Sequence, residues 1–267
     1  MGDRTERGEE RDARRLAIVP ALDEADSVAD VVAGIRRAAP DFEVLVVDDG
    51  STDGTAEVAR AAGAKVLRHP FNLGIGGAMQ SGFRWAYLNG HELAVQVDAD
   101  GQHDPDLIPR LEAILGESGA DLVWGSRFLE RRVGYRVPRS RRVGMLIFAR
   151  LVSLITRESV SDPTSGFRMT NRRGIELFAR DYPHDFPEVE ALLMVHSNDM
   201  SMREVPVTMR EREHGRSSVG GYRAVYYMAR VLLAIFVGLF RRRPLPPPGD
   251  NWLTASPTAT LDAARRG

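Results

Sequence analysis

The sequence predicts an α/β protein with a mainly parallel sheet flanked by helices. Two observations carry this prediction. Short apolar runs alternate with segments of helical periodicity from residue 16 onward, and the runs at 43–47 and 92–97 each lead into acidic side chains. Strands that alternate with helices form βαβ units, whose strands run parallel. The 267 residues, of which 43% are hydrophobic, suffice for one large domain with a single core.

The first half of the chain is expected to fold as alternating strands and helices. Turn residues separate the apolar runs, and Pro105 stands where proline is tolerated, in the first turn of a helix. The expected strands cover 16–19, 43–47, a segment near Lys65, 92–97 and 121–125. The expected helices cover 27–38, 55–62 and the segments that follow 74–78 and Pro105.

An arginine-rich loop follows residue 125 and precedes an apolar, helix-like segment at 145–155. Two interpretations are open. The loop and the helix form a solvated connection and an ordinary core helix, or they form a headgroup-facing surface beside a helix that dips into a membrane. The arginines of this loop are Arg131, Arg132, Arg136, Arg139, Arg141 and Arg142.

The segment 222–240 is almost continuously apolar and is followed by three arginines. Its uninterrupted stretch, 231–240, is about half of the roughly 20 residues that a membrane-spanning helix needs. We expect an amphipathic helix at 220–243 that lies at the membrane interface, because tyrosines suit that boundary and arginines face anionic lipid. The alternative is a helix that packs against the sheet or a partner subunit. The segments 1–15 and 244–267 are expected to be disordered tails.

Composition excludes several classes of function. The formal net charge of -1 gives no global field that would recruit nucleic acid, and no basic recognition helix is indicated. The absence of cysteine excludes disulfides, thiolate zinc sites and cysteine nucleophiles. The first fifteen residues mix charges without an apolar core, so neither a signal peptide nor an anchor is expected there. His103, His184 and His196 show no paired spacing for metal ligation and are expected to be loop or packing residues.

Two carboxylates leave the end of the apolar strand at 92–97. Alternate side chains of an extended chain share a face, so Asp98 and Asp100 are expected to point the same way. Two anions held that close need a cation between them, and a hard divalent ion fits best. The pattern therefore predicts a site for a divalent metal and a diphosphate, although an acidic turn at a strand end would give the same tripeptide.

A second acidic pair, Asp48 and Asp49, follows the strand at 43–47. Ligands of open α/β sheets bind at the carboxyl edge of the strands, and carboxylates there accept hydrogen bonds from base or ribose groups. The polar residues at 51–53 are expected to serve the fold instead, since such residues commonly cap a following helix.

Three motifs occur in order along the chain: VVDDGSTDGT at 46–55, DADGQHDP at 98–105 and DPTSGFR at 162–168. With these motifs the chain resembles the family 2 glycosyltransferases of the GT-A fold, a Rossmann-like architecture. Within that family it looks most similar to the dolichyl- and polyprenyl-phosphate sugar synthases. The resemblance covers 16–219, which is the expected GT-A domain.

The resemblance implies a nucleotide-sugar donor, linked to UDP or GDP, and a divalent cofactor, Mg2+ or Mn2+. The residues implied to contact base and ribose are Pro20, Ala21, Glu24, Asp48 and Asp49. The residues implied to hold the metal are Asp98, Asp100 and Gln102, and loss of Asp98 or Asp100 is expected to abolish most catalysis.

Two arginines are implied to bind phosphate. Arg127 is expected near the donor or acceptor phosphate, with a surface arginine at a strand end as the alternative. Arg212 and Ser217 belong to an R-x-x-G-x-S segment that is implied to grip the phosphates when its loop closes. The position after this serine, lysine in many relatives, is Ser218 here, and Arg216 is expected to compensate for the missing charge.

Acidic residues are implied near the acceptor and the sugar. Asp162 begins the segment that the resemblance places beside the acceptor phosphate, and Arg168 at its end is expected to bind there or to support the sheet. Glu188 is the first candidate for a carboxylate near the sugar and Glu190 the second. Two solvated carboxylates on a helix are the alternative.

These implications predict an inverting glycosyltransferase that moves a hexose or N-acetylhexosamine to polyprenyl phosphate. A lipid phosphate is already ionised at neutral pH, so positioning and charge stabilisation would dominate catalysis. One alternative is an acceptor other than a lipid phosphate in cell-envelope glycan synthesis, with Asp162, Glu188 or Glu190 as general base. Another is an inactive donor-binding partner of a membrane protein. The protein is expected on the cytoplasmic face of the membrane, held by 220–243 and by a small membrane protein.

Overall fold

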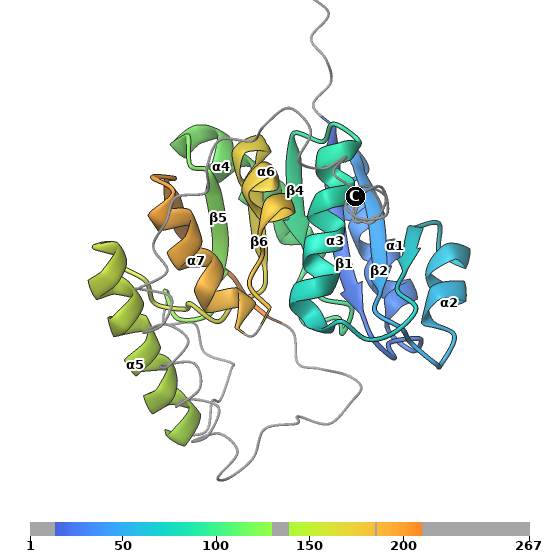
Figure 1. Cartoon of the computed structure of the whole chain (residues 1–267), viewed down its shortest axis with the longest axis horizontal. Coiled ribbons are helices and arrows are strands. Elements are labelled where there is room, and N and C mark those ends of the chain that lie inside the picture. The colour runs from blue at the N-terminus through green and yellow to red at the C-terminus, as the bar shows by residue number, and fades with distance from the viewer. Residues whose placement is uncertain (1–13, 130–138, 185, 210–267) are drawn as a thin grey trace, which may run out of the picture.

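One mixed sheet forms the centre of the molecule. The computed structural model describes residues 14–129, 139–184 and 186–209 (Figure 1). The seven strands of this sheet are β1 (Arg15–Ala21), β2 (Phe42–Asp48), β3 (Lys65–Arg68), β4 (Leu93–Gln96), β5 (Leu122–Ser126), β6 (Arg168–Asn171) and β7 (Met202–Pro206). They lie in the order β3-β2-β1-β4-β6-β5-β7, and neighbouring strands are parallel except where β6 pairs with β4 and β5.

Helices cover both faces of this sheet. They are α1 (Val28–Ala38), α2 (Thr55–Ala61), α3 (Gly74–Leu88), α4 (Ile108–Ser118), α5 (Arg139–Thr156), α6 (Arg172–Arg180) and α7 (Pro187–Ser197), with a short 3-10 helix, η1 (Pro105–Leu107), before α4. In Figure 1, α3, α6 and α7 lie on the side of the sheet that faces the viewer, and α1 and α4 lie behind it. The predicted α/β architecture is thus confirmed.

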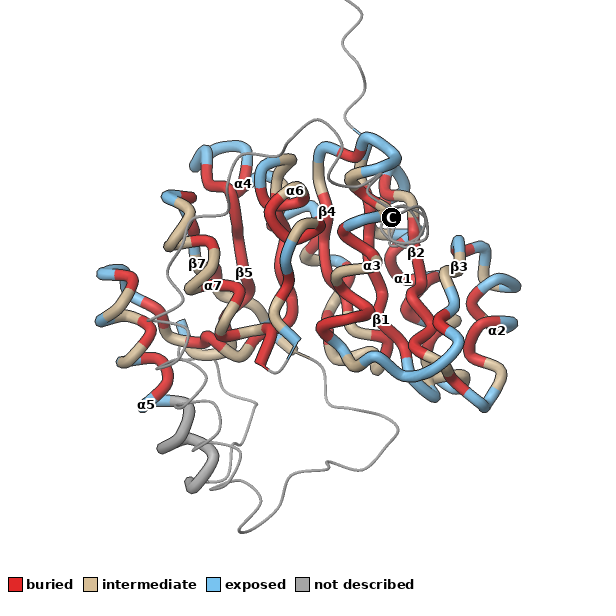
Figure 2. The backbone as a smooth tube through the Cα atoms, viewed as in Figure 1, coloured by how far each residue is buried: buried red, intermediate tan, exposed pale blue. Residues whose placement is uncertain are grey.

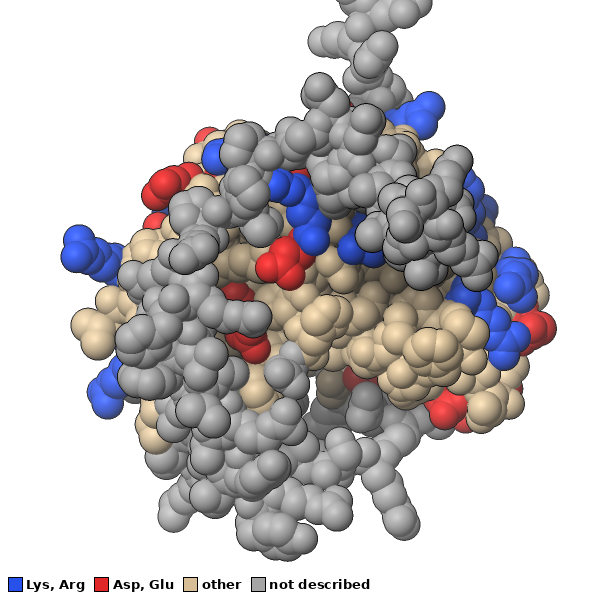
Figure 3. Space-filling view, viewed as in Figure 1, with Lys and Arg blue, Asp and Glu red and all other residues tan. Residues whose placement is uncertain are grey.

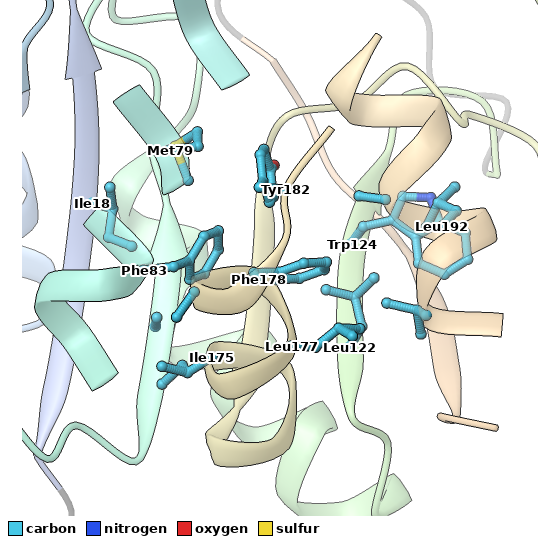
Figure 4. Packing of buried hydrophobic residues seen from close by; sticks show 14 of the residues in the cluster. Ile18, Met79, Phe83, Leu122, Trp124, Ile175, Leu177, Phe178, Tyr182 and Leu192 are labelled. Atoms are coloured by element: carbon cyan, nitrogen blue, oxygen red, sulfur yellow. The ribbon is translucent and has the colours of Figure 1, made fainter. Parts of the chain in front are cut away.

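The apolar core is divided between the two faces of the sheet. On the face of α3 and α6, the rings of Phe83, Phe178 and Tyr182 lie with centroids 5.0 to 5.4 Å apart (Figure 4). On the opposite face, Val32 of α1 and Leu111 of α4 are buried in a second cluster. Figure 2 shows that most of the strand backbone is buried between these layers. Burial on both faces is why the strands read as continuous apolar runs.

Glycines let α3 approach its neighbours closely. A Cβ atom at Gly82 would collide with the Ile18 side chain of β1. A Cβ atom at Gly76 would meet the carbonyl oxygen of Pro183 and would lie 2.6 Å from the Cα atom of His184. The amino end of α3 is therefore fixed against the segment that leads to α7.

The alternation predicted for the first half of the chain is confirmed, and the helix expected at 145–155 extends over all of α5. The strand β1 begins at Arg15, inside the segment expected to be a tail. The strand β6 was not predicted, because its four residues, Arg-Met-Thr-Asn, carry no alternating pattern and are defined by pairing on both sides. The interfacial helix expected at 220–243 and the tail at 244–267 lie outside the described residues.

Surface charge and helix length bear on the expected partners. On the face seen in Figure 3, Lys and Arg side chains and Asp and Glu side chains both occur near the middle and toward the edges, so the two signs are interspersed. Among the helices within the described ranges, none combines the length and the apolar character that crossing a membrane requires.

Candidate active site

The predicted site residues gather at the carboxyl edge of the sheet, around the neighbouring strands β1 and β4. The sheet continues in opposite directions from this pair, through β2 and β3 on one side and through β6, β5 and β7 on the other. Open α/β sheets bind ligands in the crevice outside such a switch point. Ala21 ends β1 here, and Asp98 follows β4 by two residues.

The turns after β1 and β2 are joined by reciprocal hydrogen bonds. The backbone N–H of Asp23 donates to Ser51 Oγ at 3.0 Å, and that of Thr52 donates to Asp23 Oδ1 at 2.9 Å. The backbone N–H of Glu24 donates to Thr55 Oγ1 at 2.9 Å. Ser51 and Thr52 thus serve the fold, as predicted, by holding the neighbouring turn. Asp53 serves it at the start of α2, where its Oδ1 accepts the backbone N–H of Thr55 at 3.0 Å.

Asp48 is fully buried at the end of β2, and the protein itself binds its carboxylate. Oδ1 accepts a hydrogen bond from the backbone N–H of Ser51 at 2.9 Å, and Oδ2 lies 3.1 Å from Arg68 Nε. Both partners border a surface hollow of about 470 Å³. The residues that line this hollow are Gly50, Ser51, Thr52, Arg68, His69 and Pro70.

Asp49 is bound just as fully, at the amino end of α3. Its Oδ1 lies 2.7 Å from His69 Nδ1 and accepts the backbone N–H of Leu73 at 2.9 Å. Its Oδ2 accepts the backbone N–H of Gly74 at 2.8 Å. A carboxylate at a helix amino end satisfies free N–H groups and opposes the positive end of the helix dipole. Asp49 therefore anchors the loop between β3 and α3, and its contact with a ribose or base stays a prediction.

The Asp98 carboxylate is oriented by neighbouring side chains and remains 37% exposed. Gln96 Nε2 donates to its Oδ1 at 3.1 Å, and His103 Nε2 lies 3.5 Å from its Oδ2. The backbone N–H of Asp98 donates to His103 Nδ1 at 3.0 Å, and the His103 ring stacks on Phe167 at 5.0 Å. His103 was expected to be a loop or packing residue. It does pack, and it also faces the predicted metal ligand; its place five residues after Asp98 was the only sequence signal.

Asp100 and Gln102 lie in the turn after Asp98. Gly101 has a positive φ of 75°, which permits this turn, and the backbone N–H of Gln102 donates to Asp100 Oδ1 at 3.0 Å. The strand β4 ends at Gln96, so both aspartates lie beyond the strand and strand alternation does not set their relative orientation. That they point the same way stays a prediction.

The oxygen ligands of this turn fit a divalent metal that shares its coordination with a substrate. In the described part of the chain, no group of three or more His, Cys, Asp or Glu side chains could hold a metal alone. Mg2+ commonly takes one or two carboxylates and completes its shell with substrate phosphates and water. Gly166 keeps the Asp98 carboxylate accessible, because a Cβ atom at this position would lie 3.3 Å from both of its oxygens.

Arg127 and Asp162, both predicted near the phosphates, form one buried ion pair. Arg127 Nε and Nη2 donate to the two oxygens of Asp162 at 2.7 and 2.8 Å, and the Arg127 backbone N–H adds a bond of 3.2 Å. Thr164 Oγ1 donates to Asp162 and accepts from Arg127. Asp162 is fully buried, whereas the Arg127 side chain is 10% exposed. A bidentate pair fixes the plane of the guanidinium, so this arrangement favours Asp162 as the holder of Arg127 over a role as general base.

Arg168 is buried and ties three segments together. Its Nε donates to the carbonyl oxygen of Ser165 at 2.8 Å, and its Nη2 donates to the carbonyl oxygens of Pro163 and Glu188. Burial lowers the pKa of the Arg168 guanidinium, and the nearby Tyr182 and Glu188 oppose that shift. Of the two expected roles, these contacts favour support of the framework.

Glu188 lies in the first turn of α7, which begins at Pro187. Burial raises the pKa of its carboxyl group, Arg168 and Arg127 act in the opposite direction, and Asp98 adds to the rise. Asp98 and Arg127 come from the loops after β4 and β5 and Arg168 begins β6, so the Glu188 carboxylate belongs to the same site as Asp98. Perturbed carboxyl groups of this kind cluster at functional sites.

The remaining predicted residues are spread over the edge of the site or lie outside the described ranges. Pro20 and Ala21 end β1 and are buried, and a Glu24 oxygen accepts a hydrogen bond from Ser27 Oγ at 2.9 Å. The R-x-x-G-x-S segment with Arg212 and Ser217 lies outside the described residues.

Comparison with known proteins adds independent findings. The model of the family described as Glycosyl transferase family 2 matches residues 16–178. The chain is 34% identical over 217 residues to an undecaprenyl-phosphate mannosyltransferase from Micrococcus luteus. That alignment covers 78% of this chain and 88% of the relative. It is 31% identical to a polyprenol monophosphomannose synthase from Mycolicibacterium smegmatis, over 78% of this chain and 82% of the relative.

A solved structure supports the fold. Glucosyl-3-phosphoglycerate synthase from Mycobacterium tuberculosis, in complex with Mn2+, uridine diphosphate and phosphoglyceric acid, superposes with a TM-score of 0.64. The match covers 89% of this chain and 81% of that chain at 23% identity, so the likeness concerns the fold.

Proposed function

This chain belongs to glycosyl transferase family 2, and we propose that it transfers a hexose or N-acetylhexosamine from a UDP- or GDP-linked donor to polyprenyl phosphate. The observation that carries the proposal is the convergence of a partly exposed Asp98, the fixed guanidinium of Arg127 and the half-buried Glu188 at one edge of the sheet. Named relatives support the acceptor, since both mannose-transferring enzymes described above carry a polyprenyl phosphate in their names.

The donor side of the site would be formed by the turns after β4, β1 and β2. Asp98, Asp100 and Gln102 would hold Mg2+ or Mn2+, and a metal bound there stabilises the charge that develops on the departing nucleoside diphosphate. Support comes from the side chains that orient Asp98 and from a fold neighbour solved with Mn2+ and uridine diphosphate. The nucleoside would lie toward the turns after β1 and β2, where Pro20, Ala21, Glu24, Asp48 and Asp49 are found.

The acceptor side of the site would bind the phosphate of the lipid. Arg127 presents a guanidinium whose plane is fixed by its two bonds to Asp162, and its positive charge at this edge of the sheet suits the approach of a phosphate. Arg212 and Ser217 are proposed to contribute when bound to the phosphates. With the acceptor oriented in this way, one phosphate oxygen forms the bond to the anomeric carbon as the bond to the donor diphosphate breaks, and the configuration inverts. No protein base is needed, because the attacking phosphate is already ionised.

Attachment to the cytoplasmic face of a membrane is part of the proposal. The helix α5 buries Phe148 and Val152 but leaves apolar side chains on its outer face. Leu146 is 52% exposed, Ile147 47% and Leu154 78%. An apolar face next to an arginine-rich segment suits an anionic bilayer surface. The segment 220–243 and a small membrane protein are proposed as further contacts.

The proposal is tested by transfer of labelled sugar from UDP- and GDP-linked donors to polyprenyl phosphate, with Mg2+ or Mn2+ supplied. We expect one donor to give a lipid-linked product and Asp100→Ala to lose about 100-fold or more of the turnover, because a metal ligand is removed. The matched control is Asp106→Ala, which removes an acid that is 57% exposed in a surface pair with Arg37. Equal turnover of wild type and Asp100→Ala would contradict the metal role, and donor consumption without lipid product would point to another acceptor.

A further inference from the structure

The turn at Ser161 and Asp162 is held by a carboxylate from a distant strand. Glu204 of β7 lies opposite Trp124 of β5 in the sheet. Its Oε1 accepts the backbone N–H of Asp162 at 2.7 Å, and its Oε2 accepts the backbone N–H of Ser161 at 2.8 Å. The hydroxyl of Ser161 donates to Oε1 at 2.9 Å. One side chain thus satisfies three donors of this turn.

Neighbouring contacts hold the same turn from the side of β5. Ser126 Oγ lies 2.7 Å from Ser161 Oγ, and Trp124 Nε1 donates to the carbonyl oxygen of Asp162 at 3.2 Å. With its backbone fixed, Asp162 can direct its carboxylate at Arg127. A continuous series of short contacts therefore runs from Glu204 through Asp162 to Arg127.

We propose that Glu204 is a positioning residue for the acceptor phosphate, acting through Asp162 on the guanidinium of Arg127. The inference rests on the proposed function, because it takes Arg127 as the group that contacts the lipid phosphate. No sequence pattern indicates this role, since Glu204 is separated from Asp162 by 42 positions and stands in none of the three motifs.

The site requires a carboxylate. Ionised Glu is an acceptor at both oxygens, whereas Gln replaces one oxygen by an NH2 group that only donates. In Glu204→Gln, either orientation of the amide sets its NH2 group against a backbone N–H of the turn, at the place of Oε1 or of Oε2. The size of the side chain is kept, so the substitution changes the hydrogen bonding and leaves the packing largely intact.

The experiment compares the Michaelis constants of the full-length wild type and Glu204→Gln for both substrates. We expect the KM for polyprenyl phosphate to rise about tenfold or more while the KM for the donor stays within about twofold. In an Arg127→Ala background, Glu204→Gln should have no further effect, because residues that act through one another are not additive. Equal changes in both KM values, or an undiminished effect of Glu204→Gln in that background, would overturn the inference.

A matched control separates positioning from general stability. Asp121 is a buried carboxylate at the opposite end of β5, where it accepts the backbone N–H of Ser201 at 2.9 Å and the Asn171 amide at 2.9 Å. Asp121→Asn should lower the unfolding midpoint without a selective change in the KM for the lipid. A selective rise of that KM in Asp121→Asn would count against the inference.

A second variant, Ser161→Ala, serves if Glu204→Gln yields no folded protein. It removes one donor to Glu204, so the KM for polyprenyl phosphate must rise by a smaller factor, and no rise overturns the inference. Wild type that forms no lipid product refutes the proposed function itself. Active wild type with an unchanged Glu204→Gln variant refutes only the role of Glu204.

Discussion

At the residue scale, the exposure of the Asp98 carboxylate depends on Gly166, which has no side chain. Gln96 and His103 approach the carboxylate from within the protein. Because His103 Nδ1 accepts a backbone N–H, the proton of the neutral ring is assigned to Nε2, which faces Asp98. Gly166 borders both carboxylate oxygens and has no side chain to cover them.

Substitution of Gly166 tests this arrangement. A Cβ atom in Gly166→Ala would lie 3.3 Å from both Asp98 oxygens and 2.9 Å from Gln96 Nε2, so the Gln96 amide that donates to Asp98 must shift. We expect Mn2+ affinity, measured by calorimetry, to fall about tenfold, as when a partner of a metal ligand is disturbed. Unfolding in urea should change little.

Gly116→Ala is the control for this substitution. Its Cβ atom would meet nothing within 4 Å, and the residue lies within α4. We expect unchanged Mn2+ affinity and a gain in stability of about 0.5–1 kcal/mol, since alanine replaces glycine inside a helix. Wild-type metal affinity in Gly166→Ala would show that Asp98 tolerates the added methyl group without consequence.

The sequence could nominate single residues but not their partners. Asp98 and Asp162 were named from motifs, Arg127 and Glu188 from what the resemblance implies, and the structure brings the four together. That Asp162 binds Arg127 depends on a contact across 35 positions, which no local pattern encodes. The same limit hid Glu204, whose partners lie across the sheet.

At the element scale, the junction between α3 and β4 carries a buried histidine. His91 is buried, and its Nδ1 lies 3.3 Å from the carbonyl oxygen of Ala86. Burial lowers the pKa of His91 below the ordinary value of 6.5, although the bond to Ala86 and the charge of Glu43 act in the opposite direction. The folded state therefore favours the neutral ring.

This histidine predicts how stability depends on pH. The unfolded chain binds the proton near pH 6.5 and the folded chain only at lower pH, so the free energy of unfolding should decrease as pH falls below 6.5 toward the lowered pKa. In His91→Gln, urea unfolding between pH 7.5 and about 5 should show a smaller decrease. His184→Gln, at an exposed position, is the control and should follow wild type. Parallel curves for wild type and His91→Gln would refute this account.

Elements were predictable where the chain follows one rule. From β1 to β5, strands alternate with helices, and hydrophobic runs mark the buried strands, whereas β3 is only partly buried. The strand β6 runs antiparallel to both β4 and β5, and its first residue, Arg168, is a buried charge that donates to backbone carbonyls where an apolar core residue would be expected. Its position follows from pairing with distant strands, which periodicity cannot show.

At the scale of the whole molecule, the site combines loops from both halves of the sheet. The turns after β1 and β2 form one unit through their reciprocal hydrogen bonds. The loops after β4 and β5 meet the amino end of α7 around Asp98, Arg127 and Glu188. Order along the chain, recognised through three motifs, predicted this assembly as a family property. The contacts between these residues could not be predicted from the motifs, because they join segments that are distant in the sequence.

The central claim is that the sugar is joined to a lipid phosphate. The most direct measurement is mass spectrometry and NMR of the lipid fraction after purified protein is incubated with a UDP- or GDP-linked sugar, polyprenyl phosphate and Mn2+. We predict a polyprenyl phosphate carrying one sugar on its phosphate, with the anomeric configuration inverted relative to the donor. A lipid that remains unmodified while the donor is consumed, or a product with retained configuration, would contradict the account.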